Sequence, residues 1–157
     1  MLIYQSKKVI EHTKLLLNSY KHWKHEDLIE ANVDDKKLSE NLYLAPFVVL
    51  SHDGAEDPVL SYGNQAALDL WGMTWDSFIH TPSRLTAEPI HRDERSGLLH
   101  HVAEYGFCEN YSGIRISNSG KRFRIENAYL WTLIDEQGKT CGQAATFNKW
   151  TYLDPLG

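Results

Sequence analysis

The chain has 157 residues, 42% of them hydrophobic and 24% charged, a balance typical of one soluble globular domain. Its net charge of −5 argues against sequence-independent nucleic-acid binding, which needs clustered lysine and arginine. Cys108 and Cys141 form no C-x-x-C pair, so we expect neither a zinc nor a redox motif. Charges lie close to every apolar run at the N-terminus, so we expect no signal peptide or membrane span, and we place the chain in a reducing cytoplasm.

An amphipathic helix is predicted for about the first 30 residues. Apolar side chains recur at helical spacing at Val9, Leu16, Tyr20 and Trp23, and lysines occupy the opposite side. This stripe must be covered, either by the outer face of a sheet in the same chain or by a second subunit. The second arrangement predicts a homodimer through these four residues.

The polar segment 30–41 is typical of a connector. We therefore expect two units, an N-terminal helix with its connector at 1–37 and a folded domain at 38–157. Two β-rich runs, 44–52 and 59–64, begin the folded domain.

A helix is predicted directly after the second of these runs. Asn64 is placed to cap a helix over 65–71, and Gly72 is placed to end it. Short helical turns are predicted within 74–89, and a longer helix over 92–105.

The remaining residues predict three strands, 109–117, 122–135 and 140–150, joined by glycine-containing turns. The chain therefore predicts an α+β fold, with an antiparallel sheet and helices gathered on one of its faces.

Hydrophobic matching across the two turns predicts the register of these strands. It pairs Ile114 with Ile125, and it sets Arg115 opposite Arg124 on the outer face. The predicted inner face is mostly apolar but includes the polar groups of Asn127, Tyr129 and Gln143, and a ligand seated among them would also contact Trp131. A buried polar group without a partner costs about 1–3 kcal/mol. Either these groups satisfy one another and the nearby backbone, with ordered water, or a small ligand completes them.

Two further residues join the candidate ligand site. Trp75 follows the first short helix and could line the mouth of a cavity. Arg84 lies in the turn-rich segment 83–88, where it could bind a carboxylate or phosphate as a bidentate donor. In the alternative interpretation, an Arg84–Glu88 ion pair only locks this loop.

Several stretches resemble a known family. "YGNQAALDLWG", "IHRDER" and "YSGIRISNSGKRFRIE" are similar to the strand-to-helix junction, the later helix and the hairpin of PAS domains. "PSRLTAEP" and "CGQAATF" resemble, more narrowly, the MEKHLA domain, a PAS-like family found in small bacterial proteins and at the C-terminus of certain plant transcription factors. The resemblance implies a five-stranded antiparallel sheet, helices over one face, and a sensory or regulatory role. It implies no particular ligand.

Cofactor and metal chemistry find little support in the sequence. No cysteine lies between Gly72 and Tyr105, where the flavin photosensors of this fold carry their reactive residue, so covalent flavin chemistry is not expected. Haem binding is not expected either, because no histidine is clearly placed as an axial ligand. "HWKHE" lacks the H-E-x-x-H order of a zinc-binding helix, and we predict no metal site and no catalytic residue.

Three functions remain open. The first is a PAS-like sensor that binds a small organic ligand and signals through a protein partner or a homodimer, with no direct contact to nucleic acid or membrane. The second is a ligand-free interaction module in transcription or signalling. The third is an enzyme that uses the region around Ser83.

Overall fold

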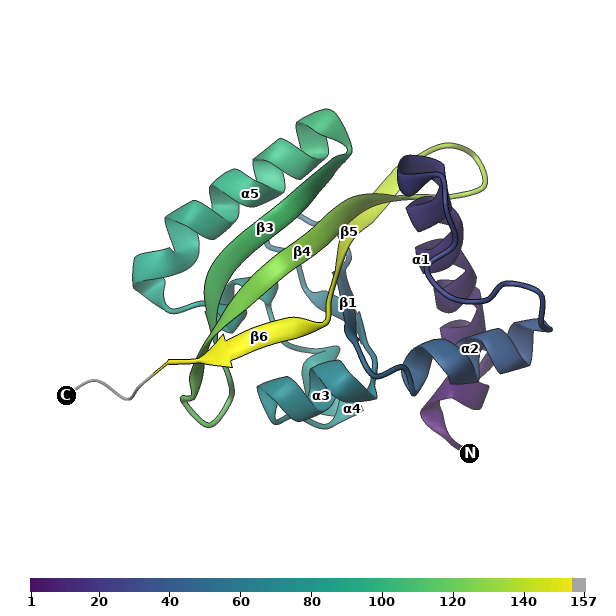
Figure 1. Ribbon diagram of the computed structural model, residues 1–157, viewed down its shortest axis with the longest axis horizontal. Coiled ribbons are helices and arrows are strands. Elements are labelled where there is room, and N and C mark those ends of the chain that lie inside the picture. The colour runs from purple at the N-terminus through teal and green to yellow at the C-terminus, as the bar shows by residue number, and fades with distance from the viewer. Residues whose placement is uncertain (154–157) are drawn as a thin grey trace.

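A computed structural model describes residues 1–153 of the chain (Figure 1). Within these residues six strands form one antiparallel sheet. They are paired in the order β2-β1-β5-β4-β3, and β6 pairs with the first part of β4. The strands are β1 (Val48–His52), β2 (Leu60–Gly63), β3 (Phe107–Ile116), β4 (Arg122–Ile134), β5 (Thr140–Phe147) and β6 (Lys149–Tyr152).

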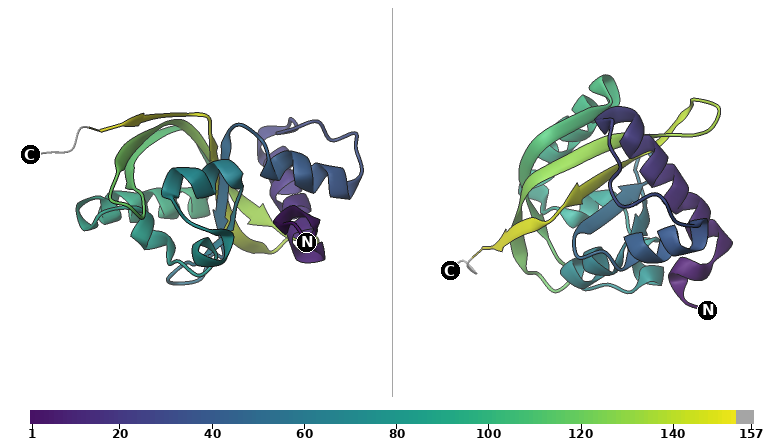
Figure 2. Two further views of the ribbon diagram at one scale, coloured as in Figure 1. Left: turned by 90° about the horizontal axis from the view of Figure 1, so that it is seen from below. Right: turned by 45° about the vertical axis from the view of Figure 1, so that its right-hand side comes forward.

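The helices divide between the two faces of this curved sheet (Figure 2). The inner, concave face is covered by α3 (Gln65–Trp71), α4 (Trp75–Phe78), two 3₁₀ turns (Ser83–Thr86 and Pro89–His91) and α5 (Arg92–Tyr105). The N-terminal 3₁₀ turn (Ile3–Gln5), α1 (Lys7–Lys24) and α2 (Asp35–Tyr43) lie on the other side. The α+β prediction is confirmed, with β6 added to the five expected strands.

Helix α1 packs against the outer face of its own sheet. Its N-terminus is capped by Ser6, whose hydroxyl accepts a hydrogen bond from the Val9 N–H at 3.2 Å. The side chains of Val9, Leu16 and Tyr20 are buried there, and Trp23 is half-buried. The chain therefore adopts the first of the two arrangements open to this stripe, with its own sheet as the cover.

Helix α2 corrects the expectation that segment 30–41 is only a connector. Asp34 caps this helix by accepting a hydrogen bond from the Lys37 N–H at 2.8 Å. Leu42 and Tyr43 are buried at its end. Burial of these two side chains outweighs the polar composition that favoured a loop, as tertiary packing often does.

Asn64 has the structural role that the sequence predicts. Its side-chain oxygen accepts hydrogen bonds from the Ala67 N–H at 3.1 Å and from the Val49 N–H at 3.0 Å. Its amide donates to the carbonyls of Leu42 and Phe47 at 3.1 and 2.8 Å. One fully buried side chain thus caps α3 and fixes it to β1 and to the end of α2.

The register predicted for the β3–β4 hairpin is wrong by one residue. Ile114 lies opposite Arg124 rather than Ile125. Two β-bulges also interrupt the pairing, at Asn110 in β3 and at Asn127 in β4, where φ is 54° and 53°. Asparagine is one of the few residues that tolerate this left-handed backbone. Hydrophobic matching assumes strict alternation, and each bulge exchanges the faces of the residues beyond it.

The β4–β5 register is shifted in the same way. Trp131 pairs with Ala144, where the sequence predicted Gln143. After the bulge in β4, Tyr129 and Trp131 face outward under α1, whereas Gln143 faces the inner helices. The predicted inner face is therefore split between the two sides of the sheet.

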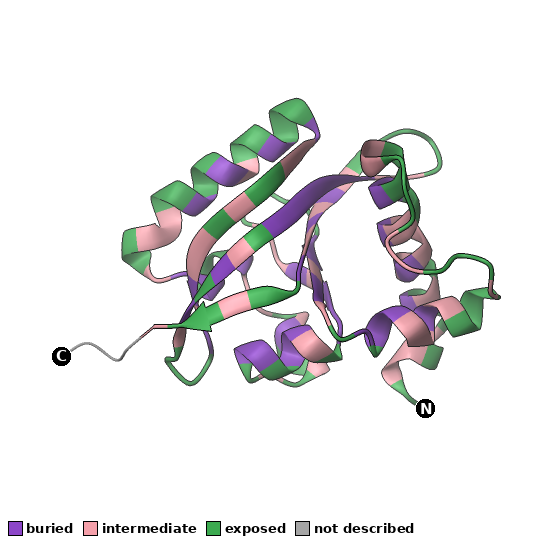
Figure 3. Ribbon diagram, viewed as in Figure 1, coloured by how far each residue is buried: buried purple, intermediate pink, exposed green. Residues whose placement is uncertain are grey.

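Both faces of the sheet are consequently buried, as the continuous purple in the second part of β4 shows (Figure 3). Two clusters of buried side chains fill the molecule. The inner cluster surrounds Trp71 and includes Phe78, Phe123 and Phe147. The outer cluster joins α1 to the sheet and includes Leu16, Tyr20, Trp131 and Leu133.

Candidate functional site: a cavity between the sheet and α5

A cavity of about 70 Å³ lies in the inner layer. Strands β1, β3, β4 and β5 form its floor, and α3, α5 and the turn at Ser83–Thr86 cover it. Its lining is apolar over most of its extent, through Leu50, Leu60, Trp71, Ile125, Ala128, Leu130, Ala145 and Phe147. The polar side chains that line it are Ser83, Thr86, Arg95, Tyr111, Arg115, His52 and Gln143.

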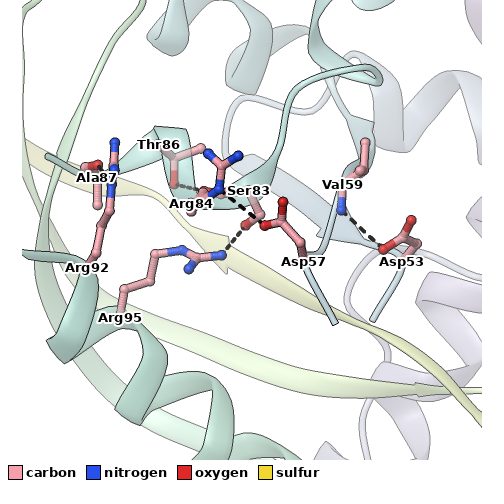
Figure 4. Close-up of polar contacts among 9 residues, drawn as sticks. All are labelled: Asp53, Asp57, Val59, Ser83, Arg84, Thr86, Ala87, Arg92 and Arg95. Atoms are coloured by element: carbon pink, nitrogen blue, oxygen red, sulfur yellow. Dashed lines mark hydrogen bonds and ion pairs between the residues drawn. The ribbon is translucent and has the colours of Figure 1, made fainter. Parts of the chain in front are cut away.

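Arg95 reaches this cavity from α5. It lies on the buried side of the helix, three residues before Leu98, and is only 5% exposed. Its Nη2 donates a hydrogen bond to the Ser83 hydroxyl at 2.6 Å (Figure 4). Ser83 is held in turn by its backbone N–H, which donates to the Pro58 carbonyl at 2.7 Å. Helix α5 and the 3₁₀ turn thus fix a guanidinium against the cavity.

Arg115 enters the same cavity from β3 and is 7% exposed. Its Nη1 donates to the Ile114 carbonyl at 2.8 Å, and its Nη2 donates to the Tyr111 hydroxyl at 3.0 Å. The expectation that it lies on the outer face opposite Arg124 is wrong, because the register places it beside Phe123 on the inner face.

The positive charge of the two arginines is incompletely balanced. Glu94 is half-exposed, accepts a hydrogen bond from the Tyr111 hydroxyl at 2.9 Å and lies 4.0 Å from Arg115. Within residues 1–153, no carboxylate forms an ion pair with Arg95. Burial and, less strongly, the neighbouring charge of Arg115 together lower the pKa of Arg95 to about 10, against the smaller opposing effect of the Asp57 carboxylate.

A second polar pair lines the cavity at the paired residues His52 and Gln143. The Gln143 amide donates to the Leu99 carbonyl of α5 at 3.0 Å. Its oxygen and the Nε2 atom of His52 are buried, and neither has a partner of good hydrogen-bond geometry in the described part of the chain, although the two side chains are close enough to interact with each other. Burial and then the charge of Arg95 lower the pKa of His52 to about 4, so this ring is neutral at pH 7. The cavity therefore presents buried polar atoms that the described part of the chain does not fully satisfy.

The six residues predicted to bind a ligand do not form one site. Gln143 lines the cavity, but Tyr129 and Trp131 lie on the outer face under α1. Asn127 is exposed in the β4 bulge. Trp75 packs against Tyr62 and lines a groove beside α1 instead.

The sixth residue, Arg84, also lies outside the cavity lining. It pairs with Asp57 at 3.3 Å on the surface (Figure 4). The predicted Arg84–Glu88 pair is wrong, because Glu88 accepts two hydrogen bonds from Arg122, at 2.6 and 3.1 Å. A helical turn at Ser83–Thr86 directs the Arg84 side chain away from Glu88.

Sequence reasoning missed the two arginines that matter most. The helical spacing of Arg95 with Leu98 and Val102 was a usable signal, since it sets the charge on the buried side of α5. Arg115 could not be placed without the geometry of the turn between β3 and β4, which sets the hairpin register and so decides its face.

A polar contact on the outer face links α1 to β1. The His12 Nε2 atom lies 2.9 Å from the Ser51 hydroxyl, which is 2.8 Å from the Ser61 hydroxyl. Burial, and then the charge of Lys8, lower the pKa of His12 to about 4. The ring also stacks on Tyr62, so α1 is docked through a neutral histidine.

Comparison with known proteins finds one matching family model and several solved structures of similar fold. The model of the MEKHLA domain matches residues 10–152. The PAS domain of a protein from Colwellia psychrerythraea superposes with a TM-score of 0.61 at 13% identity, over 71% of this chain and 92% of that one. No curated protein matches the chain.

Two Light-Oxygen-Voltage proteins are also similar in fold. An RNA-binding Light-Oxygen-Voltage receptor gives a TM-score of 0.61 at 20% identity, over 81% of this chain and 34% of that one. A Light-Oxygen-Voltage domain studied with a flavin analogue gives 0.58 at 16% identity, over 75% of this chain and 85% of that one. At these identities the likeness shows the fold alone.

The cavity does not fit a flavin. A space of about 70 Å³ suits a few water molecules or a compact molecule, and it is far too small for a three-ring system. Trp71 and the two arginines fill the space around it, and its described lining includes no cysteine. Within residues 1–153, no helix is both long and apolar enough to cross a bilayer.

Proposed function

The chain belongs to the MEKHLA domain family, and on that premise we propose that it is a PAS-like sensory domain that binds a small molecule in its central cavity. The bound state is passed to a protein partner through α1. The observation that carries this proposal is the cavity itself, where buried polar atoms of His52 and Gln143 have no partner in the described residues beyond each other. A mostly apolar cavity with a few convergent polar groups is typical of ligand sites.

A physical route joins the cavity to α1. Thr132 in β4 donates its N–H to the Gly106 carbonyl at 2.8 Å and its hydroxyl to the Val102 carbonyl at 3.3 Å. The Thr132 carbonyl accepts the indole N–H of Trp23 at 2.9 Å. One buried residue therefore contacts both α5, which carries Arg95, and α1. A ligand that shifts α5 changes the free energy of α1 docking, which is a population shift between docked and released helix.

The partner is a protein that binds either α1 or the outer sheet face that α1 covers. A second copy of the chain would meet the same requirement only by exchanging α1, because Leu16 and Tyr20 cannot pack on two sheets at once. Cytoplasmic location and a role in transcription or signalling belong to this proposal.

Native mass spectrometry of the purified protein tests ligand binding. We expect a retained small molecule, or recovery of one after the unfolded chain is refolded in cell extract. Ala128→Leu, which fills the cavity from β4, should abolish retention, whereas Ala103→Leu on the exposed side of α5 should not. A clean mass for the wild type under every condition would contradict the sensor.

The second candidate is an interaction module without a ligand, and the small volume of the cavity favours it. A few ordered waters could satisfy His52 and Gln143 in about 70 Å³. If the chain is such a module, Ala128→Leu should leave partner binding unchanged. If the chain is a sensor, the same variant should change partner binding, so this measurement separates the two candidates.

A further inference from the structure

The paired arginines point to the chemical class of the ligand. This inference rests on the proposed function, since it concerns the same cavity. Both guanidinium groups are more than nine-tenths buried, and both line the cavity. Burying a charge is costly unless a counter-charge and hydrogen bonds compensate it. A site that holds two such charges side by side is incomplete without an anion.

The available partners leave most guanidinium donors unused. Arg95 gives one hydrogen bond, to Ser83, and Arg115 gives two, to Ile114 and Tyr111. A guanidinium carries five N–H donors in a planar fork. Two carboxylates lie near the pair in the described residues. Glu94 is half-exposed and lies 4.0 Å from Arg115, and Asp57 acts on Arg95 through its charge but forms its ion pair with Arg84.

We propose that the cavity binds a small organic carboxylate, held by Arg95 and Arg115 through its oxygens and by the apolar lining through its hydrocarbon part. Fork-shaped donors match the two oxygens of a carboxylate. Leu50, Leu130 and Phe147 offer no hydrogen bonds, and the space is about 70 Å³, so they suit a short aliphatic body rather than a sugar or a nucleotide. The overall charge of −5 makes this positive cavity a local feature rather than a general basic surface.

The first test compares carboxylates with neutral molecules of the same shape. Acetate and propionate are titrated against acetamide and propionamide, with the ionic strength held constant, and binding is followed by thermal shift and by calorimetry. We expect saturable binding of at least one carboxylate and at least tenfold weaker binding of its amide. Amides that bind as tightly as the carboxylates would overturn the inference and leave the small-molecule sensor intact. No binding by any probe, together with a clean native mass, would overturn both.

The second test removes the charges singly. Arg95→Met and Arg115→Met should each weaken carboxylate binding at least tenfold, whereas Arg124→Met, on the exposed outer face of β4, should leave it unchanged. Unchanged binding in both cavity variants would overturn the assignment.

Melting temperatures measured without any probe decide the question if these variants are too unstable for binding measurements. If Arg95 is held for a ligand, the probe-free Arg95→Met protein should melt at a higher temperature than the wild type, because a buried charge without a carboxylate partner is removed. If Arg95 is purely structural, the same variant should melt lower, and Arg95→Lys should restore stability. The second pattern would overturn the inference.

Discussion

At the scale of single residues, Asn64 shows how one side chain can organise three elements. All of its hydrogen-bonding capacity is used, by the N–H groups of Val49 and Ala67 and by the carbonyls of Leu42 and Phe47. No other residue type offers a donor pair and an acceptor on so short a side chain.

Asn64→Ala should therefore destabilise the fold by about 3 kcal/mol, because it removes a helix cap and leaves buried backbone groups without partners. Urea unfolding followed by circular dichroism measures the change. Gln65→Ala, at the exposed next position, should shift stability by about 0.5 kcal/mol or less. Equal losses in both variants would show that the network around Asn64 adds nothing beyond helix propensity.

At the scale of elements, α1 is fixed to the sheet by side chain–backbone bonds as well as by apolar contact. The Trp131 indole donates to the Leu16 carbonyl at 3.2 Å, and the Trp23 indole donates to Thr132 at 2.9 Å. The Ser19 hydroxyl accepts from the Ile134 N–H at 2.9 Å. Gly106 allows the Trp23 ring to lie against it, since a Cβ there would overlap the ring.

Trp23→Phe keeps an aromatic ring at this position but removes the bond to Thr132, together with the outer part of the indole that lies against Gly106. We expect α1 to open more often, with amide hydrogen exchange in α1 about fivefold faster, which corresponds to about 1 kcal/mol of lost docking free energy. Exchange in β4 should change less. Asn18→Ala, on the exposed side of α1, is the matched control. Identical exchange in Trp23→Phe and the wild type would remove Thr132 from the proposed route.

The elements themselves were largely predictable, and their pairing was not. Capping by Asn64, the stop at Gly72 and the helix over 92–105 are local signals, and all three are confirmed. The face of each strand residue depends instead on the bulges at Asn110 and Asn127, which propensity and periodicity do not reveal. The candidate site inherited these errors of register, so Tyr129 and Trp131 were placed in the cavity and Arg115 was left out of it.

At the scale of the whole molecule, two buried histidines make stability depend on pH. The pKa of His12 and that of His52 are both lowered to about 4, chiefly by burial, whereas an unfolded histidine titrates near 6.5. Between these values the unfolded chain binds protons that the folded chain excludes. Stability is therefore full above about pH 6.5 and is lost as the pH falls towards 4.

Each histidine should contribute up to about 3 kcal/mol of this loss. Urea unfolding at a series of pH values from 7 down to 4.5 measures it, above the range in which most carboxylates titrate. His12→Gln should remove about half of the slope, while His100→Gln, on the exposed side of α5, should leave the slope unchanged. A slope unaffected by His12→Gln would mean that this ring is protonated or solvated in the folded protein.

The bulge at Asn127 carries a consequence for insertions and deletions. Deleting that one residue would turn the rest of β4 over, so that the indole of Trp131 would point into the central cavity and Leu130 would point towards α1. Substitutions at position 127 leave the strand the same length and cost only the local backbone preference. The distal half of β4 thus depends on chain length at this point more strongly than on the identity of the residue there.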